Sequence, residues 1–438
     1  MGSNVTRREF LATTAATGVG LTMASVSATA SRADAATAPP ELIVYHGKIV
    51  TVDPQFRIAE AMAIAGERIV AVGSNDDVLR LAGPNTKRID LSGKTVMPGL
   101  IDSHLHAVSG SMTEFDHPVP TMETIEDVLD HVRSRAAELP EGTWITISQV
   151  FITRLREQRF PTREELDKAA PKHPVLFRTG PDASINSLAL KLSGIDRDFQ
   201  ITDGQPGIIE RDPGAGEPTG IIRNGGRFIK SKGSGKSATQ EDKADRLAAM
   251  LAAYNAVGIT SITDRGVSDG SMKLYEQLND SNRLSCRVFL TYVLNPRASV
   301  EDIDSRIQTA ANHPLHKYNN RLWLRGTKVW LDGGMLTGTA YMRKPWGVSS
   351  IYAITDPEYC GLRFIEPERL EQIYRLSMEN GFQPAAHAVG DGAVHTILDA
   401  CDRINRDLTV RPCRPCICHS NFMSLEAVKA MQRLGVVA

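Results

Sequence analysis

Two histidines lie one residue apart in the stretch GLIDSHLHA, residues 99–107. Side chains alternate between the two faces of a β-strand, so a strand here places Asp102, His104 and His106 on one face. Neutral imidazole is the most common metal ligand in proteins, and two imidazoles at this spacing can bind one divalent ion. An isolated His-x-His is often a surface accident. A metal site therefore requires further ligands from elsewhere in the chain.

Two more histidines follow apolar stretches near the C-terminus. His387 lies in QPAAHAVGD and His419 lies in CICHSNF. A single buried histidine is more often a core residue than a ligand. The carboxyl ends of barrel strands converge on one site, however, and three apolar strands that each end in histidine rarely arise by chance. The pattern favours one shared site for these side chains.

A lysine lies within another apolar stretch, LRGTKVWLDGG. Burial of an ammonium group is unfavourable unless the charge is paired or removed. Spacing alone favours an ion pair between Lys328 and Asp332. The alternative is that the amine takes up carbon dioxide and becomes an anionic oxygen ligand that bridges two metal ions.

These side chains require strands that end at a common edge. From residue 240 onward, apolar strands alternate with amphipathic helices, which is typical of a parallel α/β sheet. Strands are expected in ITSITD, CRVFLTYVL, LWLRGTKVWL, QPAAHAVG and CICHSNF. Helices are expected over residues 243–258 and 394–404, and a last helix is expected between Ser424 and Gly435. A (β/α) barrel fits this order. A doubly wound sheet is the alternative, weakened because no Gly-x-Gly-x-x-Gly follows the first strand.

The N-terminal half contains two different regions. Residues 41–97 are β-rich and predict a small sheet domain, with strands at about residues 42–45, 48–52, 60–65 and 68–72. Residues 108–240 form a long insertion after the first barrel strand. Insertions of this kind usually shape the substrate pocket at the carboxyl ends of the strands.

The composition is that of an ordinary globular protein, with 42% hydrophobic and 23% charged residues in 438. A net charge of −1 gives no electrostatic reason to expect nucleic acid as a partner. The sequence contains no run of about 18 apolar residues, so stable membrane insertion is not expected. The six cysteines show no regular disulfide framework.

The first 38 residues resemble a bacterial twin-arginine export signal. Arg7 and Arg8 precede Phe10, a mildly apolar stretch follows, and Ala33 and Ala35 offer a cleavage site. The resemblance implies that the twin-arginine machinery exports the folded protein, with its metal, to the periplasm or beyond. The alternative is a tail with a chance arginine pair.

Taken together, the residues resemble the amidohydrolase superfamily. The strand ending in Asp-x-His-x-His, the strand lysine and the later histidines carry this resemblance. The motifs PGLIDSHLH, GEPTG and HAVGDGAVHTILDA are similar to amidohydrolase family 3, which includes N-substituted formamide deformylase-like hydrolases. The resemblance covers about residues 41–438. It implies a TIM-like (β/α)8 barrel over residues 98–438 and a small β-sandwich to which residues 41–97 contribute.

The resemblance also implies a metal site and an activity. One or two divalent ions, with Zn²⁺ expected, would be held by His104, His106, His387 and His419, and carboxylated Lys328 would bridge them. The reaction would be hydrolysis of a non-peptide carbon–nitrogen bond in a small molecule such as an amide, formamide or cyclic amide. A lactone or ester hydrolase on the same barrel remains open.

Members of the family also carry a catalytic aspartate after an eighth barrel strand. Counting strands places CICHSNF sixth and residues 435–438 at the start of the seventh, so this aspartate is not within the 438 residues. Asp264 and Asp332 also end strands, but neither occupies that place. We expect a fragment of a longer protein. The alternative is an inactive metal-binding or scaffold protein.

Two other stretches differ from simple expectation. In RTGPDASINSLAL, Gly180 is followed by Pro181 where related sequences commonly have Gly-His, so a different substrate contact is expected. Cys413, Cys416 and Cys418 suggest a zinc knuckle, but a second Cys-x-x-Cys is missing, and packing around the sixth strand is the favoured interpretation. The substrate itself is not predicted.

Overall fold

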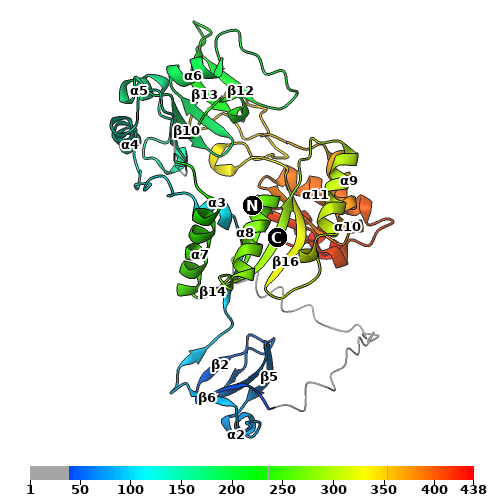
Figure 1. Ribbon diagram of the computed structural model, residues 1–438. Coiled ribbons are helices and arrows are strands. Elements are labelled where there is room, and N and C mark those ends of the chain that lie inside the picture. The colour runs from blue at the N-terminus through cyan, green and yellow to red at the C-terminus, as the bar shows by residue number, and fades with distance from the viewer. Residues whose placement is uncertain (1–38, 149, 234–235, 353) are drawn as a thin grey trace, which may run out of the picture. The chain divides into compact units, whose positions relative to one another are not determined.

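The chain divides into two compact units, with the boundary between Pro98 and Gly99. The computed structural model describes residues 39–148, 150–233, 236–352 and 354–438 (Figure 1). The predicted export signal, residues 1–38, lies outside the described residues.

The first unit contains two small sheets and a short helix, α2 (Asn75–Leu79). One sheet has the strand order β5-β4-β1-β6 and the other the order β3-β2-β7. The strands are β1 (Leu42–Tyr45), β2 (Lys48–Val50), β3 (Ile58–Ala59), β4 (Ala61–Ala65), β5 (Arg68–Gly73), β6 (Lys87–Asp90) and β7 (Thr95–Val96). The predicted strands are therefore present, whereas a sandwich built from both chain ends stays a prediction.

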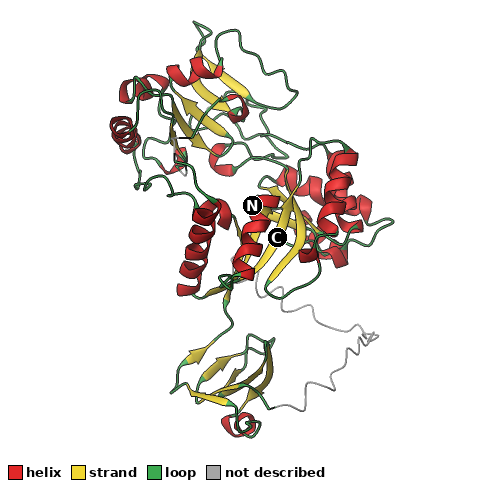
Figure 2. Ribbon diagram, in the orientation of Figure 1, coloured by secondary structure: helices red, strands yellow, loops and turns green. Residues whose placement is uncertain are grey.

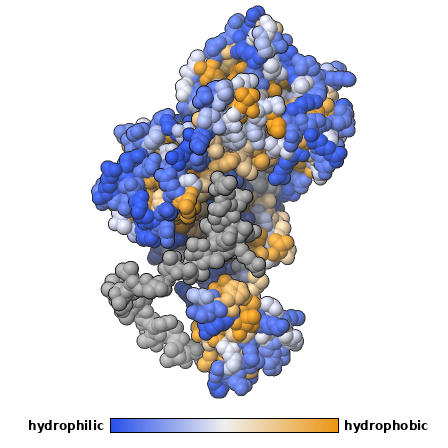
Figure 3. Space-filling model, turned by 180° about the vertical axis from the view of Figure 1, so that it is seen from behind, coloured by the Kyte–Doolittle hydropathy of each residue, from blue (hydrophilic) through white to orange (hydrophobic). Residues whose placement is uncertain are grey.

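Only a small core supports this unit. Ile43, Ala61, Ala63 and Val78 form its buried apolar cluster. Other large apolar side chains stay in contact with solvent, and Figure 3 shows hydrophobic patches on the unit that carries β2, β5 and β6. Ile69 of β5, for example, is 62% exposed. Natural proteins usually cover such surfaces.

The second unit is built around a six-stranded sheet in which every neighbouring pair is parallel. Its order is β18-β17-β16-β15-β14-β8. The strands are β8 (Leu100–Leu105), β14 (Ile259–Val267), β15 (Arg287–Val293), β16 (Leu322–Trp330), β17 (Gln383–Ala388) and β18 (Cys416–His419). The sheet curls so far that its two edge strands approach each other. The evidence is that the rings of His104 in β8 and His419 in β18 lie 4.6 Å apart. This nearly closed arrangement confirms the barrel and excludes the doubly wound sheet.

Val437 forms a parallel bridge with Cys416 of β18. It lies beside β18, where the sequence analysis places the start of the next strand.

Helices cover the outer face of the curled sheet (Figure 2). They are α3 (Ala107–Ser111), α7 (Gln240–Ala256), α8 (Asp269–Asp280), α9 (Val300–Ala311), α10 (Pro367–Glu379), α11 (Asp391–Ile404) and α12 (Leu425–Leu434). Three of them match the predicted helices, and Ser424 and Gly435 cap α12 as expected. A helix thus follows each central strand and leaves the carboxyl ends of the strands free for chemistry.

The insertion forms a second, five-stranded sheet with the order β12-β13-β11-β10-β9. Its elements are α4 (Ile125–Glu138), β9 (Ile145–Ile147), α5 (Arg163–Ala169), β10 (Val175–Thr179), β11 (Asp182–Ile185), α6 (Ser187–Ser193), β12 (Ile208–Arg211) and β13 (Pro218–Arg223). Two apolar clusters of its own support this sheet. The predicted insertion is thus a folded layer and not an extended loop.

Short 3-10 helices complete the second unit: Ile152–Arg154, Gly226–Phe228, Pro314–His316, Met335–Thr337 and Arg411–Cys413. Among the described residues, no helix combines the length and the apolar character needed to cross a membrane. All six cysteines are free thiols.

Candidate metal centre

The five predicted site residues lie at the carboxyl ends of the barrel strands. His104 is in β8, and His106 follows this strand directly as the residue before α3. Lys328 lies near the end of β16, His387 near the end of β17, and His419 is the last residue of β18. The strand register fixes how far along the barrel these residues lie. His387 is paired with Trp330 of β16 on one side and with Cys418 of β18 on the other.

The four imidazole rings form one continuous cluster. Ring centres are separated by 5.4 Å between His104 and His106, by 4.6 Å between His104 and His419, and by 4.5 Å between His387 and His419. These side chains come from three strands that are far apart in the sequence. The structure therefore brings the predicted histidines together.

The surroundings of the cluster favour neutral imidazoles. Burial lowers the pKa of His387 to about 4 and that of His419 to about 4, and the remaining histidines and Lys328 act in the same direction. Burial, together with His104 and Lys328, also lowers the pKa of His106. A neutral imidazole carries the free lone pair that a metal requires.

One ring is oriented by the backbone. His387 Nε2 lies 3.1 Å from the carbonyl oxygen of Gly333. A carbonyl can only accept a hydrogen bond, so Nε2 donates, and in the neutral ring Nδ1 keeps its lone pair. This contact acts like the outer hydrogen bonds that fix metal-binding histidines.

Two buried nitrogen atoms of the cluster have no hydrogen-bond partner among the described residues, His104 Nε2 and Lys328 Nζ. Lys328 is only 1% exposed, and burial lowers the pKa of its amine. The amine lies beside the sulfur of Cys418 and beside the ring of Trp330, whose centre is 5.6 Å from Nζ. Buried polar atoms are normally satisfied, so two unpaired nitrogens within one cluster make it a candidate ligand site.

The predicted ion pair between Lys328 and Asp332 is wrong. β16 ends at Trp330, and the chain then turns Asp332 toward three backbone amides. Its carboxylate accepts hydrogen bonds from the N–H groups of Tyr341, Val389 and Gly390 at 2.8–3.0 Å. Burial raises the pKa of Asp332 to about 7, and one carboxylate oxygen lies 3.8 Å from His387 Nε2. Asp332 therefore anchors the strand-end loops beside the cluster.

Asp264 has a similar structural role. Its carboxylate accepts hydrogen bonds from the hydroxyl of Tyr275 at 2.7 Å and from the N–H of Val108 at 3.3 Å. This ties β14 to α8 and to the start of α3. No catalytic role is predicted for Asp264 from the sequence.

The backbone turns sharply where β18 ends. His419 and Ser420 have φ values of 80° and 50°, in the left-handed region that side chains other than glycine rarely adopt. The Ser420 N–H donates to the carbonyl of Ala388 at 3.0 Å, which holds the turn. Such strain is concentrated at functional sites.

The donor types fit a divalent metal. Imidazole nitrogens, among them the unpaired His104 Nε2, suit Zn²⁺ better than an alkaline-earth ion, which prefers oxygen ligands. In the described ranges, however, no three His, Cys, Asp or Glu side chains form a closed ligand set. The structure thus places the predicted ligands side by side, and their role in holding a metal is a proposal.

Cys416 and Cys418 lie beside the cluster and pack against Ala385 and Val437. Both are buried. Packing around the sixth barrel strand is therefore their observed environment.

The cluster opens into a cavity of about 650 Å³, which is a size typical of small-molecule sites. His387, His419 and Asp332 are part of its wall. Other lining residues come from the insertion and from the strand-end loops: Phe151, Arg178, Gly180, Pro181, Trp330, Gly333, Gly334, Met335, Leu336, Thr337, Phe364, Val389 and Asn421. The insertion thus contributes to the pocket, as expected. Arg178 and Phe151 carry no motif by which the sequence analysis could have found them.

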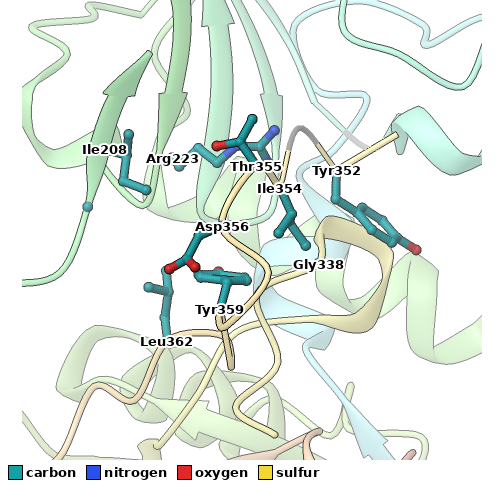
Figure 4. Close-up of a pocket in the computed structure, with 10 residues that line it drawn as sticks. Ile208, Arg223, Gly338, Tyr352, Ile354, Thr355, Asp356, Tyr359 and Leu362 are labelled. Atoms are coloured by element: carbon teal, nitrogen blue, oxygen red, sulfur yellow. The ribbon is translucent and has the colours of Figure 1, made fainter. Parts of the chain in front are cut away.

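A second cavity holds only about 80 Å³. Figure 4 shows its wall, in which Ile208 and Arg223 of the five-stranded sheet face Tyr352, Ile354 and Tyr359 of the long loop after β16. This volume leaves room for a few water molecules and not for a substrate.

Comparison with known proteins supports the fold and the family. The chain is 27% identical over 379 residues to the N-substituted formamide deformylase of Arthrobacter pascens, which is 84% of this chain and 66% of that protein. It is 27% identical over 411 residues to the protein LONG AFTER FAR-RED 3 of Arabidopsis thaliana, covering 91% of this chain and 67% of that one. The chain therefore spans about two thirds of the length of these relatives.

Solved structures agree with the fold. An uncharacterized metal-dependent hydrolase from Pyrococcus horikoshii superimposes with a TM-score of 0.61 at 22% identity, covering 90% of this chain and 74% of that one. The model of the amidohydrolase family, Amidohydro_3, matches residues 87–438. Because this match extends over most of the sequence, the chain belongs to the amidohydrolase family.

Proposed function

We propose that the protein is a metal-dependent hydrolase of non-peptide carbon–nitrogen bonds in amides, formamides or cyclic amides. The observation that carries this proposal is the cluster of four imidazoles with the buried, unpaired His104 Nε2 and Lys328 Nζ beside a cavity of about 650 Å³ that His387 and His419 line. The family membership makes hydrolysis the expected reaction class.

His104, His106, His387 and His419 would hold one or two divalent ions, with Zn²⁺ as the expected metal. A divalent ion bound there supplies Lewis acidity and lowers the pKa of water to about 7, which makes a hydroxide nucleophile available at neutral pH. The protein prepares for this by keeping the imidazoles neutral and by fixing the His387 ring on the Gly333 carbonyl.

Lys328 would become a further ligand by carboxylation. Burial lowers the pKa of this amine, which increases the fraction of the neutral form, and the lone pair of that form can attack carbon dioxide. The new N–C bond converts the amine into a carbamate, and one proton leaves to solvent. The carbamate oxygen atoms of Lys328 would then be available as further ligands for the divalent ion or ions that the histidines would hold.

The remaining side chains position the substrate. The apolar wall of the cavity excludes water from the reacting bond, and the three amides on Asp332 keep the loops around His387 in place. The preference for C–N bonds rests on the name of the relative from Arthrobacter pascens, a deformylase of N-substituted formamides.

We also propose export through the twin-arginine machinery to the periplasm or beyond. The Arg7-Arg8 pair and the alanines near residue 35 support this proposal. Replacing both arginines with lysine should leave the protein in the cytoplasmic fraction of a bacterial host. Equal export of the variant would contradict the proposal.

The activity is tested with a panel of formamides, cyclic amides and lactones. The protein, expressed from its complete coding sequence, is loaded with Zn²⁺ or Mn²⁺ and compared with His104→Ala. We expect amide or formamide hydrolysis that the variant lacks. Turnover of lactones alone would reassign the bond, and no turnover of any compound would contradict the hydrolase proposal.

A further inference from the structure

The cavity beside the histidine cluster has two walls of different origin. His387 and His419 come from the barrel strands, whereas Arg178, Gly180 and Pro181 come from the end of β10 and the turn that follows. The insertion therefore lines the cavity beside the histidine cluster with side chains of its own. These side chains can select among substrates without taking part in the bond cleavage.

Most of the cavity wall is apolar. Trp330 and Met335 line it and remain 36% and 37% exposed, although side chains of this size are normally buried. Phe151, Leu336 and Phe364 extend the same surface. Uncovered aromatic and aliphatic side chains in a concave site indicate an apolar ligand group.

Arg178 is the exception in this wall. It is the single exposed residue of β10, whose other four residues are buried. Its guanidinium has no hydrogen bond or ion pair with any residue in the described ranges. Other arginines of the same layer are paired: Arg159 with Glu165, Arg223 with Asp182, and Arg227 with Asp203.

No acid of the cavity can neutralise Arg178. Asp332, the carboxylate among the lining residues, is 1% exposed and already accepts three backbone hydrogen bonds. Pro181, which stands where a histidine was expected, offers no donor or acceptor in its side chain. The cavity thus presents one free, forked cation among apolar groups, which is the arrangement that binds a carboxylate in two-point fashion.

We propose that Arg178 selects substrates that carry a carboxylate together with an aromatic or branched aliphatic group. The apolar group would lie against Trp330, Met335 and Phe364, and the carboxylate would pair with the guanidinium. This inference rests on the proposed hydrolase function for the identity of the reacting bond. The binding preference itself does not depend on catalysis.

The test uses matched ligands with and without the carboxylate. N-formylphenylalanine is compared with N-(2-phenylethyl)formamide, and 4-(formamidomethyl)benzoate with N-(4-methylbenzyl)formamide. Dissociation constants are measured by calorimetry, and kcat/KM is measured on the metal-loaded protein. A charge-assisted hydrogen bond predicts about 10-fold or more tighter binding of the acid in at least one pair.

Three variants assign the preference to one side chain. Arg178→Met should bind both members of the pair about equally, and Arg178→Lys should keep part of the preference because it keeps the charge. Arg154→Met removes an exposed arginine that does not line the cavity, and it should behave as wild type. Thermal unfolding of each variant shows whether the fold is intact.

The outcomes separate the two proposals. Tighter binding of the acid without hydrolysis would support the role of Arg178 and contradict the hydrolase function. Hydrolysis of both members with equal binding and equal kcat/KM would support the function and overturn the role of Arg178. Binding of neither member, or a preference that survives in Arg178→Met, would also overturn it.

Discussion

In the five-stranded sheet, Arg223 donates to Asp182 at 3.2 Å and to Glu210 at 2.8 Å, with Arg223 only 7% and Asp182 0% exposed. At the ends of the six-stranded sheet, Lys328 is buried as deeply, yet its amine has no hydrogen-bond partner among the described residues. Both regions bury a basic side chain in the same unit of the chain. The Arg223 guanidinium is held by acids of the fold, whereas no acid among the described residues pairs with the Lys328 amine.

This difference separates a basic side chain that stabilises the fold, Arg223, from one that we expect to serve the function, Lys328. Removing one partner of a buried ion pair leaves an uncompensated charge and is strongly destabilising. An unpaired buried amine already destabilises the fold, so its replacement by an apolar group should help stability and harm only a function that needs it. Substitutions in the two regions should therefore have opposite effects.

The largest effect is expected for the histidine cluster. His387→Ala should lower turnover of the best substrate by more than the roughly 10- to 100-fold that loss of an outer hydrogen bond at a metal site produces, because the ligand itself is removed. Steady-state kinetics of the zinc-loaded protein measure this. His46→Ala, an exposed histidine of the first unit, is the control and should turn over normally. A fully active His387→Ala would remove the histidine cluster from the mechanism.

The next largest effect is expected for the paired cation. Arg223→Met should lower the free energy of unfolding by about 3–5 kcal/mol, because Asp182 and Glu210 stay buried without a counterion. Urea denaturation measures the change. The loss should be greater at pH 8 than at pH 5, since protonation relieves the two uncompensated carboxylates.

Arg227→Met is the matched control in the same sheet. Arg227 and Asp203 form a partly exposed pair, with side chains 23% and 35% exposed, and exposed pairs contribute about 1 kcal/mol or less. If both arginine variants lost equal stability, burial would not be the cause.

A change in the free energy of unfolding of the opposite sign is expected at the unpaired amine of Lys328. Lys328→Met should raise the free energy of unfolding of the metal-free protein by about 1–3 kcal/mol, the range for a buried polar group without a hydrogen bond. The same variant should lose activity. A clear loss of stability would show that Lys328 is held by the fold after all, and the contrast with Arg223 would disappear.

The smallest effect concerns pH. Burial raises the pKa of Asp182 to about 6 from 3.8, so between these values the folded state binds more protons than the unfolded state. The contribution of this group to stability is therefore full below about pH 4 and is lost as the pH rises through 6. Compared with Asp182→Asn, wild type should lose at most about 1.4 kcal/mol per pH unit across this window. Parallel pH profiles of the two proteins would contradict the raised pKa.

Local patterns in the sequence were sufficient for the strands and the histidines. His387 and His419 each end an apolar strand of a parallel sheet, and the ends of such strands lie at one edge, so their meeting follows from topology. The caps of α12 at Ser424 and Gly435 are equally local.

Contacts between segments that are distant in the sequence could not be predicted from these local patterns. Asp332 binds amides of residues 341, 389 and 390, and spacing along one strand suggested Lys328 instead. Arg178 reaches the cavity only because the insertion folds as a sheet whose β10 ends at its wall. Both features depend on tertiary packing that no periodicity records.

The most direct test of the account is the metal content of the purified protein. After exposure to Zn²⁺ and dialysis, elemental analysis of wild type should give one or two equivalents of zinc per chain, and His104→Ala should retain almost none. Both proteins should show the same circular dichroism, so that loss of the fold is excluded. Wild type without bound metal, or His104→Ala with as much zinc as wild type, would contradict the claim that the unpaired nitrogens at the barrel ends are there to hold a metal.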